Sequence, residues 1–171
     1  MTKSKQELFL ALYEPIHDRF ERFCRARVYG NMEYGDLINE TLLVAFEKLD
    51  TLKSEDAFLG FLFGISVRIL SNNNKKMSES HLIANDGLSE TVSSTNKTEL
   101  DAEIHFLYKA LSELSENQRE CLILFEISGF KIKEIAKIQS ASEDAIKQRL
   151  KRGRKQLSEI MTFESELKTG R

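Results

Sequence analysis

The stretch from residue 142 to residue 155 is strongly basic, with six basic and two acidic side chains. An α-helix here places Ile146, Leu150, Gly153 and Leu157 on one narrow stripe. The opposite side is polar: it carries Gln148, Lys151, Arg152 and Lys155, flanked by Lys147 and Arg154. Ammonium and guanidinium groups neutralise phosphates, and one exposed helix fits the major groove of DNA. The pattern therefore predicts contact with nucleic acid.

A shorter helical segment precedes this basic helix. Residues 129–138 have helical spacing of apolar side chains, a polar break follows at 139–140, and Ser142 is a good N-cap for the next helix. Two helices joined by a short turn form a helix-turn-helix, whose second helix reads DNA. The alternative is the solvated basic face of an ordinary helix, which leaves the preceding helix and turn unexplained.

Charge is distributed unevenly along the chain. The net charge is −2, and residues 77–101 hold one basic and five acidic side chains, so the positive charge is concentrated in the last helix. Few phosphates can be neutralised by so small a basic surface. We therefore expect weak DNA binding by the isolated protein and a larger partner that supplies the remaining contacts.

The residues that usually perform catalysis form no group here. His17, His81 and His105 do not cluster, and no nucleophile, metal or paired-carboxylate constellation is recognisable. We expect no enzyme activity, no metal and no cofactor. Cys24 and Cys121 lie in separate apolar contexts and are expected to be reduced and buried.

Targeting signals are not recognisable either. Residues 1–6 lack the apolar core of a signal peptide. The most apolar run, residues 58–70, is interrupted by Gly60, Gly64, Ser66 and Arg68 and falls short of the roughly 20 apolar residues that span a bilayer. These features predict no membrane insertion and a cytoplasmic location.

Hydrophobic periodicity predicts an all-α fold of two small helical domains joined by a flexible linker. Residues 1–76 form the first domain, with helices over 5–29 (kinked at Pro15), over 33–49, and from Ser54 to about Lys76. Residues 77–101, rich in Ser, Thr, Asn and acidic groups, form the linker. Residues 102–171 form the second domain, which contains the helix-turn-helix and ends in a polar tail expected to fray after Thr162.

One segment of the second domain is ambiguous. Residues 121–125 are strand-like by composition. A capping box from Ser115 to Gln118 precedes them and Gly129 follows, and both features favour a helix.

Residues 102–158 resemble the C-terminal domain of bacterial sigma factors of the extracytoplasmic-function type, in the sigma-70 family. The residues that carry the resemblance are Leu111-Ser112-Glu113-Leu114-Ser115, Gln118-Arg119-Glu120, Gly129, Glu134-Ile135-Ala136 and Ile146-Lys147-Gln148-Arg149-Leu150-Lys151-Arg152-Gly153. Their order and spacing match the family pattern, with Ser115 at the position of the usual proline.

Residues 8–76 resemble the other conserved domain of this family. Asp36-Leu37-Ile38-Asn39-Glu40 stands where the family has Asp-Leu-Val-Gln-Glu. Phe58, Phe61, Leu62 and Ile65 stand where it has Phe-x-x-Trp-Leu-x-x-Ile. There are departures: Arg68 replaces an Asn, Phe61 replaces a Trp, and the basic cluster that closes the domain has only Lys75 and Lys76. These departures imply weaker promoter melting and leave the overall role intact.

The resemblance implies three partners: core RNA polymerase, promoter DNA and an anti-sigma factor. The clamp helices of the largest polymerase subunit would bind Asp36, Leu37, Ile38, Asn39 and Glu40, and the flap of the second-largest subunit would also be contacted. Acidic groups beside Leu and Ile can pair with basic groups while apolar surface is buried. The alternative for residues 36–40 is a solvated acidic face.

The resemblance also implies two sets of DNA contacts. At the −10 element, loop 50–56 would receive flipped bases, and the residues that would follow the strand are Arg68, Asn72, Asn73, Asn74, Lys75 and Lys76. At the −35 element, Arg119, Lys131, Lys133, Arg149 and Arg152 would hold phosphates, and Lys147, Gln148 and Lys151 would face base edges, with Lys155 on the same surface.

These observations predict a sigma factor that directs core RNA polymerase to specific promoters for transcription initiation. One alternative is a helix-turn-helix regulator acting without core polymerase; it predicts a palindromic site and tight binding by the free protein. Another is a helical interaction protein that has lost DNA binding. The acidic helix at 36–40, followed by the loop and helix over 50–76, favours the sigma factor because a simple regulator does not need them.

Overall fold

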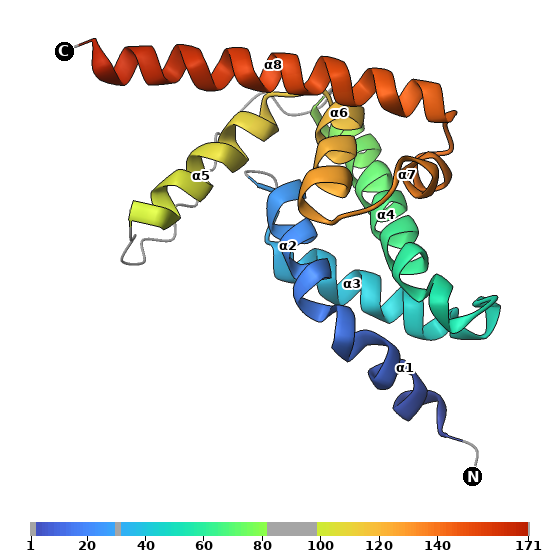
Figure 1. Ribbon diagram of the computed structural model, residues 1–171. Helices are drawn as coiled ribbons and strands as arrows, with labels where there is room; N and C mark the ends of the chain where they lie inside the picture. Colours follow the sequence, from blue (N-terminus) through green and yellow to red (C-terminus); the bar gives the residue numbers. More distant parts are fainter. Residues whose placement is uncertain (1–2, 30–31, 82–98, 171) are drawn as a thin grey trace.

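The computed structural model describes residues 3–29, 32–81 and 99–170, and within these ranges it is helical with no β-strand. The α-helices are α1 (Lys5–Tyr13), α2 (His17–Arg27), α3 (Tyr34–Glu47), α4 (Phe58–His81), α5 (Glu99–Ser112), α6 (Glu116–Leu122), α7 (Ile132–Ile138) and α8 (Glu143–Thr169) (Figure 1). Single 3-10 turns lie at Glu14–Ile16, Leu49–Thr51 and Glu55–Ala57, and a π-helical turn lies at Ile123–Ile127. The prediction of an all-α fold is confirmed.

Local sequence explains where the first helices begin and end. The Ser4 hydroxyl accepts from the Glu7 amide at 3.2 Å, and the Glu7 carboxylate accepts from the Ser4 amide at 2.8 Å, so a capping box starts α1. Pro15 lies in the 3-10 turn between α1 and α2. Proline has no amide hydrogen to donate, so the helix is interrupted there, as its position predicts.

Some helix ends differ from the predictions. Helix α4 continues past Lys76 to His81, and α8 continues past Thr162 to Thr169, so the predicted fraying of the tail is wrong. The predicted capping box at Ser115 does not form: its side chain accepts no capping hydrogen bond, and α6 starts with the Arg119 amide donating to the Ser115 carbonyl at 2.9 Å. Most of the predicted linker, residues 82–98, lies outside the described residues.

A cluster of aromatic rings forms the centre of the core. The ring centroid of Phe63 lies 4.5 Å from that of Phe23 and 4.6 Å from that of Phe130. Phe63 and Phe23 belong to residues 3–81, here called the N-terminal module, and Phe130 belongs to residues 99–170, here called the C-terminal module. The two modules are therefore packed together, with α2 against α5 and the π-helical turn, and α4 against α7.

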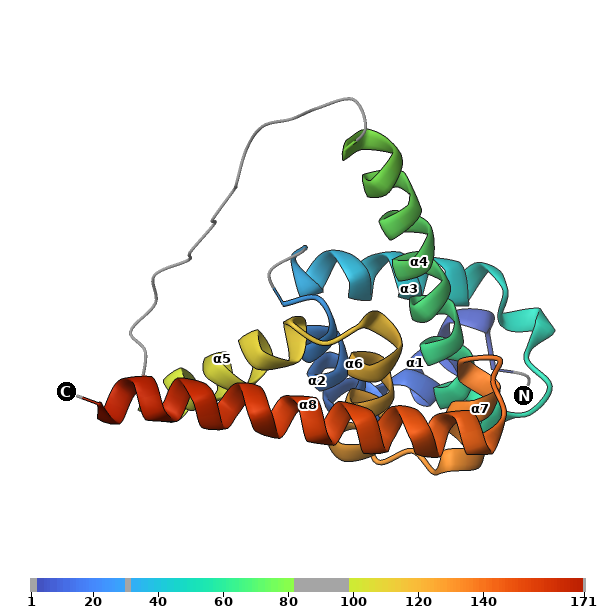
Figure 2. The same ribbon diagram turned by 90° about the horizontal axis from the view of Figure 1, so that it is seen from above.

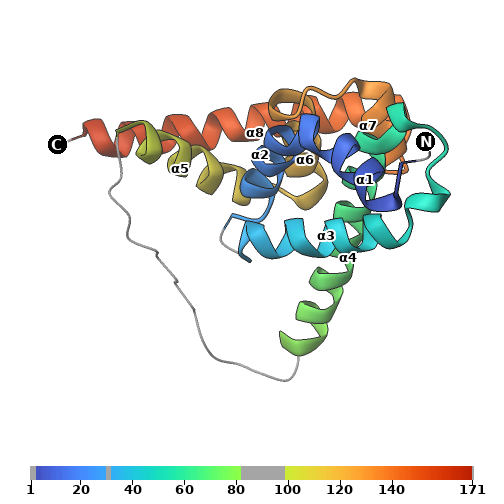
Figure 3. The same ribbon diagram turned by 90° about the horizontal axis from the view of Figure 1, so that it is seen from below.

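Two surfaces remain open in this packing. Helix α8 forms one edge of the molecule, on the far side from α1 and α3 (Figure 1). Views from above and below show the C-terminal end of α4 projecting away from the other helices (Figures 2 and 3). The division into domains 1–76 and 102–171 stays a prediction, because packing alone does not tell whether each part folds by itself.

Gly153 lets α8 approach α6 closely. A Cβ atom added at this position would lie 3.1 Å from Cδ1 of Leu122, and Gly153 is buried. It completes the apolar stripe that the sequence predicts, because Ile146 and Leu150 are also buried. The stripe seats α8 on α6 and α7 and leaves its polar side outward.

Replacing Gly153 with leucine should lower the free energy of unfolding by about 1–3 kcal/mol, because the larger side chain overpacks the contact with Leu122. Gly64→Ala in α4 is the control: a Cβ there meets no heavy atom within 4 Å, and alanine favours a helix by about 1 kcal/mol. Urea unfolding followed by circular dichroism measures both. Equal changes for the two variants would contradict the close approach of α8.

Candidate nucleic-acid and protein interfaces

The helix-turn-helix consists of α7, a short turn and α8. Ser140 has a positive φ of 50°, which reverses the chain, and the Ala141 amide donates to the Ala136 carbonyl at 2.9 Å. The Ser142 hydroxyl accepts from the Ala145 amide at 3.1 Å and caps α8, as predicted. Buried Ile135 and Ile146 hold the two helices together. The predicted helix-turn-helix is present.

The outer side of α8 carries the basic surface. Among the residues assigned to the −35 element, those with exposed side chains are Lys131, Lys133, Lys147, Gln148, Lys151, Arg152 and Lys155. The Lys147 ammonium lies 3.7 Å from the Asp144 carboxylate, an exposed pair that solvent screens. Lys147, Lys151, Arg152 and Lys155 lie on the side of α8 that faces away from the helices it packs on, and Lys131 and Lys133 lie around the start of α7, so a DNA duplex can reach them.

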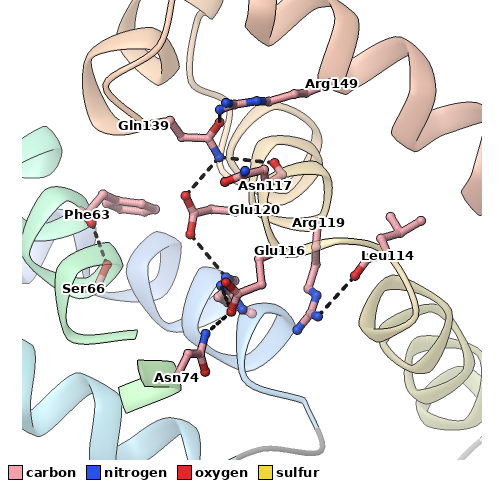
Figure 4. Close-up of polar contacts among 11 residues, drawn as sticks. Phe63, Ser66, Asn74, Leu114, Glu116, Asn117, Arg119, Glu120, Gln139 and Arg149 are labelled. Carbon is pink, nitrogen blue, oxygen red and sulfur yellow. Dashed lines mark hydrogen bonds and ion pairs between the residues drawn. The ribbon is translucent and has the colours of Figure 1, made fainter. Parts of the chain in front are cut away.

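Arg149 is only half exposed and already has a partner. Its Nη1 donates to Oε1 of Gln139 at 2.7 Å. Gln139 lies in the helix-turn-helix turn, and its Nε2 donates to the Glu120 carboxylate at 3.0 Å and to the Asn117 carbonyl at 3.3 Å. Figure 4 shows Gln139 between Arg149 and Glu120. The turn is thereby tied to both α6 and α8.

Arg119 lies in a different place from the other residues assigned to DNA. It is 7% exposed, and its guanidinium donates to the Ser112 carbonyl at 3.2 Å and to the Leu114 carbonyl at 3.3 Å. Figure 4 shows the contact with Leu114. Burial lowers its pKa, and nearby Arg27 lowers it further. The side chain points into the protein, where it binds carbonyls at the end of α5. The geometry supports a structural role for Arg119 in place of a phosphate contact.

The acidic motif on α3 divides into an inner and an outer set. Leu37 is 0% exposed and Ile38 is 9% exposed, so both belong to the core and neither offers surface to a polymerase subunit. Asp36, Asn39 and Glu40 are exposed. We call this outer set, with the exposed Leu43, the α3 strip.

Sequence reasoning did not assign Leu43. It is 60% exposed and lies on the same helix face as the outer set, because residues 36, 39, 40 and 43 follow helical spacing. That spacing was the available signal. Helical spacing separates outward-facing positions from inward-facing ones, whereas a run of consecutive residues such as 36–40 contains both.

The residues assigned to the −10 element lie along α4. Arg68, Asn72, Lys75 and Lys76 are exposed, and Asn73 is half exposed. Next to them, a cleft of about 1060 Å³ separates the two modules. Its N-terminal wall includes Lys53, Asp56 and Arg68, and its C-terminal wall includes Glu134 and Lys137. Loop 50–56 and Arg68 thus face α7 across the cleft, whereas Asn72, Asn73, Lys75 and Lys76 do not line it.

A second hollow, here called the α5–α8 groove, lies within the C-terminal module. It has a volume of about 640 Å³, and its apolar lining includes Leu107 and Leu111 of α5 and Leu157 and Met161 of α8. At its rim Arg154 donates to the Glu126 carboxylate at 2.6 Å and 2.9 Å. The groove is an apolar surface with charged edges, suited to a protein segment.

Within the described ranges, no three or more His, Cys, Asp or Glu side chains come together as a metal site would need. Nor is any described helix sufficiently long and apolar to cross a bilayer. Cys24 and Cys121 are both buried, as predicted, and burial raises the pKa of the Cys121 thiol to about 11. Both thiols are therefore poor nucleophiles.

Sequence comparisons match both modules to proteins of one kind. The family model described as "Sigma-70, region 4" matches residues 107–157. The ECF RNA polymerase sigma factor EcfG of Rhodopseudomonas palustris (strain TIE-1) is 29% identical over 133 residues, which cover 77% of this chain and 74% of EcfG. The ECF RNA polymerase sigma factor BldN of Streptomyces coelicolor is 25% identical over 146 residues, which cover 82% of this chain and 55% of BldN.

Structural comparison agrees. The sigma factor RpoE of Bartonella quintana, solved in complex with the anti-sigma factor NepR, superposes with a TM-score of 0.68 and 26% identity, covering 92% of this chain and 96% of that one. CnrH, solved in complex with the cytosolic domain of CnrY, has a TM-score of 0.64 and 22% identity over 90% of this chain and 87% of that one; this match bears on the fold alone.

If Arg119 has the structural role, Arg119→Ala should lower the free energy of unfolding by about 1.5–3 kcal/mol, because two charge-assisted hydrogen bonds, one buried and one part-buried, are lost. Arg152→Ala, which removes an exposed guanidinium, should change it by less than about 0.5 kcal/mol. Thermal unfolding of the free protein measures both. A stable Arg119→Ala protein with weakened DNA binding would restore the phosphate role.

Proposed function

We propose that the chain is an extracytoplasmic-function sigma factor of the sigma-70 family, which directs core RNA polymerase to promoters, and that it divides this work among α3, α4 and α8. The observation that carries the proposal is the exposed basic side of α8, mounted on a helix-turn-helix inside the segment matched to region 4. The chain itself carries out no reaction and acts in the cytoplasm, where transcription takes place.

Helix α8 enters the major groove of the −35 element. Lys147, Gln148 and Lys151 face base edges, and Arg152 with Lys155 holds phosphates. Gln148 supports this division because an exposed amide both donates and accepts, which suits base edges. Lys131 and Lys133, exposed around the start of α7, hold phosphates beside the groove. Arg149 joins them after giving up its bond to Gln139.

The α3 strip binds the clamp helices of the largest polymerase subunit. Asp36, Asn39 and Glu40 offer acceptors to basic groups, and Leu43 supplies apolar surface beside them. Buried Leu37 and Ile38 support this contact indirectly, because they anchor α3 to the core and hold the strip in place. Charged groups at the edge of such an interface mainly set specificity and association rate.

Helix α4 and loop 50–56 trap the melted −10 element. Arg68, Asn72, Asn73, Lys75 and Lys76 follow the backbone of the single strand, and the loop takes the extruded bases. Capture drives strand opening because a trapped base cannot restack, and the pocket offsets an unstacking cost of a few kcal/mol. The thin basic cluster at the end of α4 implies weak melting.

Two further partners complete the proposal. The flap of the second-largest polymerase subunit docks in the α5–α8 groove, whose apolar lining suits an inserted apolar segment and whose Glu126–Arg154 rim adds polar contacts. An anti-sigma factor covers the polymerase-binding and DNA-binding surfaces when the protein is held inactive. The RpoE complex with NepR supports this regulation by similarity.

Reversing two charges of the α3 strip tests the polymerase contact. Asp36→Lys with Glu40→Lys should weaken binding to core RNA polymerase by on the order of 2 kcal/mol, roughly thirtyfold, because like charges then face each other. Fluorescence titration of labelled sigma factor with core enzyme measures this. Glu14→Lys with Asp18→Lys, an exposed pair with the same spacing on another surface, is the control. Equal affinity for both double variants would reject the clamp assignment.

Alanine scanning of α8 tests the DNA contact. In the holoenzyme, Lys147→Ala or Gln148→Ala should relax the preference among −35 sequences by about 1–3 kcal/mol at the affected position. Arg152→Ala should weaken binding to all −35 sequences alike. It should also reduce, by about one, the steepness with which the logarithm of the binding constant falls with the logarithm of salt concentration. Promoter binding across a set of −35 variants measures this. If all three variants behave alike, the division between base and phosphate contacts is wrong.

The alternative regulator makes an opposite prediction for the free protein. We expect the free sigma factor to bind promoter duplex poorly at physiological salt, because its basic surface neutralises few phosphates. Nanomolar binding without polymerase, together with no promoter-specific transcription in a reaction with core enzyme, would favour a regulator that acts alone.

A further inference from the structure

One glutamine side chain joins the helix-turn-helix turn to two helices. Gln139 lies directly after α7 and is half-buried. Its Nε2 donates to Oε1 of Glu120 at 3.0 Å and to the Asn117 carbonyl at 3.3 Å, both in α6. Its Oε1 accepts from Nη1 of Arg149, in α8, at 2.7 Å. Both polar atoms of the amide are therefore engaged at once (Figure 4).

Glutamine is the side chain that this position requires. The Glu120 carboxylate only accepts hydrogen bonds and the Arg149 guanidinium only donates them, so the group between them must do both. A carboxylate here would repel Glu120, and an ammonium group would repel Arg149. Turning the amide over would set its NH2 group against the guanidinium and its oxygen against the carboxylate. The amide therefore has one orientation, with its oxygen directed at Arg149.

The acceptor in this contact is held more firmly than the donor. Glu120 is 6% exposed, and its second oxygen accepts from Nε of Arg27 at 3.3 Å, which fixes the carboxylate beside Gln139. The Asn117 carbonyl belongs to the backbone of α6. Arg149, in contrast, reaches Gln139 from α8 with a long side chain and is half exposed. When the contact breaks, Arg149 is the partner that moves.

Arg149 lies on the flank of α8. It follows the exposed Gln148 and precedes the buried Leu150, and successive residues of an α-helix are about 100° apart. From this flank the guanidinium reaches either the turn, as observed, or the phosphate backbone beside the major groove. A guanidinium binds phosphate most strongly through two parallel N–H groups. Gln139 occupies Nη1 and draws it toward α6, so the two contacts compete.

We propose that Gln139 is a positioning residue for promoter binding: its amide oxygen competes with DNA phosphate for the Arg149 guanidinium, which lowers the affinity for every −35 sequence alike. The inference rests on the proposed function, in which Arg149 contacts the DNA backbone. The competition is effective because the acceptor belongs to the same protein and already lies 2.7 Å from the guanidinium. DNA must therefore break a charge-assisted hydrogen bond before it gains this phosphate contact.

The competition affects how the protein selects DNA. Phosphate contacts supply affinity without sequence information, whereas base-edge contacts supply the discrimination. Gln139 restrains one cation of the first kind and leaves the base-edge candidates Lys147 and Gln148 exposed. A larger share of the binding free energy then comes from base contacts, so occupancy is confined to promoters with a well-matched −35 element.

Removing the acceptor tests the competition. Gln139→Met keeps the length of the side chain, and its thioether is too weak an acceptor to hold a guanidinium. In holoenzyme assembled from the full-length factor and core RNA polymerase, it should raise the affinity for all −35 variants by about tenfold, the effect of one hydrogen bond to a charged group. The steepness of the salt dependence should not change, because the bound complex makes the same phosphate contacts. Gln156→Met, the same change at an exposed position of α8, is the control.

A double-mutant cycle with Arg149 separates competition from a general loosening of the turn. Arg149→Ala alone should weaken binding to all −35 variants and make the salt dependence shallower by about one. In the Arg149→Ala background, Gln139→Met should give no gain in affinity. A gain of the same size in both backgrounds overturns the inference, and so does an unchanged or lower affinity of Gln139→Met when Arg149 is present.

Exchanging two side chains gives a second test, which decides the question if Gln139→Met does not fold. Gln139→Glu together with Glu120→Gln keeps a donor and an acceptor between α6 and the turn, and it places a carboxylate against Arg149. Because both partners are then charged, the bond is stronger, and the affinity for −35 DNA should fall by about tenfold. A higher or unchanged affinity contradicts the competition. If the unmodified factor with core enzyme binds no promoter, the proposed function itself fails.

Discussion

The packing of the two modules depends on one buried guanidinium. Arg27 is only 3% exposed in the packed protein, and its charge is balanced across the module boundary by the buried Glu120 and the exposed Glu116. Removing one partner from a buried ion pair typically costs about 3–5 kcal/mol, because the other charge is left buried and uncompensated. The cluster therefore sets the register in which the two modules pack.

The division of each helix into an inward and an outward side connects this packing to function. Helix α8 buries Ile146, Leu150 and Gly153 against α6 and α7, which turns its cations toward solvent. Helix α3 buries Leu37 and Ile38, which turns Asp36 and Glu40 outward. In both helices the apolar stripe positions the binding surface, so a change in the stripe would disturb binding without touching a contact residue.

Some residues assigned from the sequence have side chains that pack inside the protein in the structure. Arg119 matches a family position, and its guanidinium binds the carbonyls of Ser112 and Leu114. Leu37 and Ile38 belong to a motif in which some residues face the core and others face solvent, and these two face the core. Ser115 begins α6 through its backbone carbonyl, since Gln118 is directed inward and leaves its Oε1 buried without a partner.

The sequence by itself determined the helices, the helix-turn-helix with its Ser142 cap, the interruption at Pro15 and the polar side of α8, because each follows from local periodicity and from residues close in the chain. Only the tertiary structure decided that Arg27 meets Glu120, that Phe130 packs on Phe63, and that Leu43 rather than Leu37 is exposed. Such contacts join residues far apart in the sequence, and no local pattern encodes which distant partner a buried charge or ring will find.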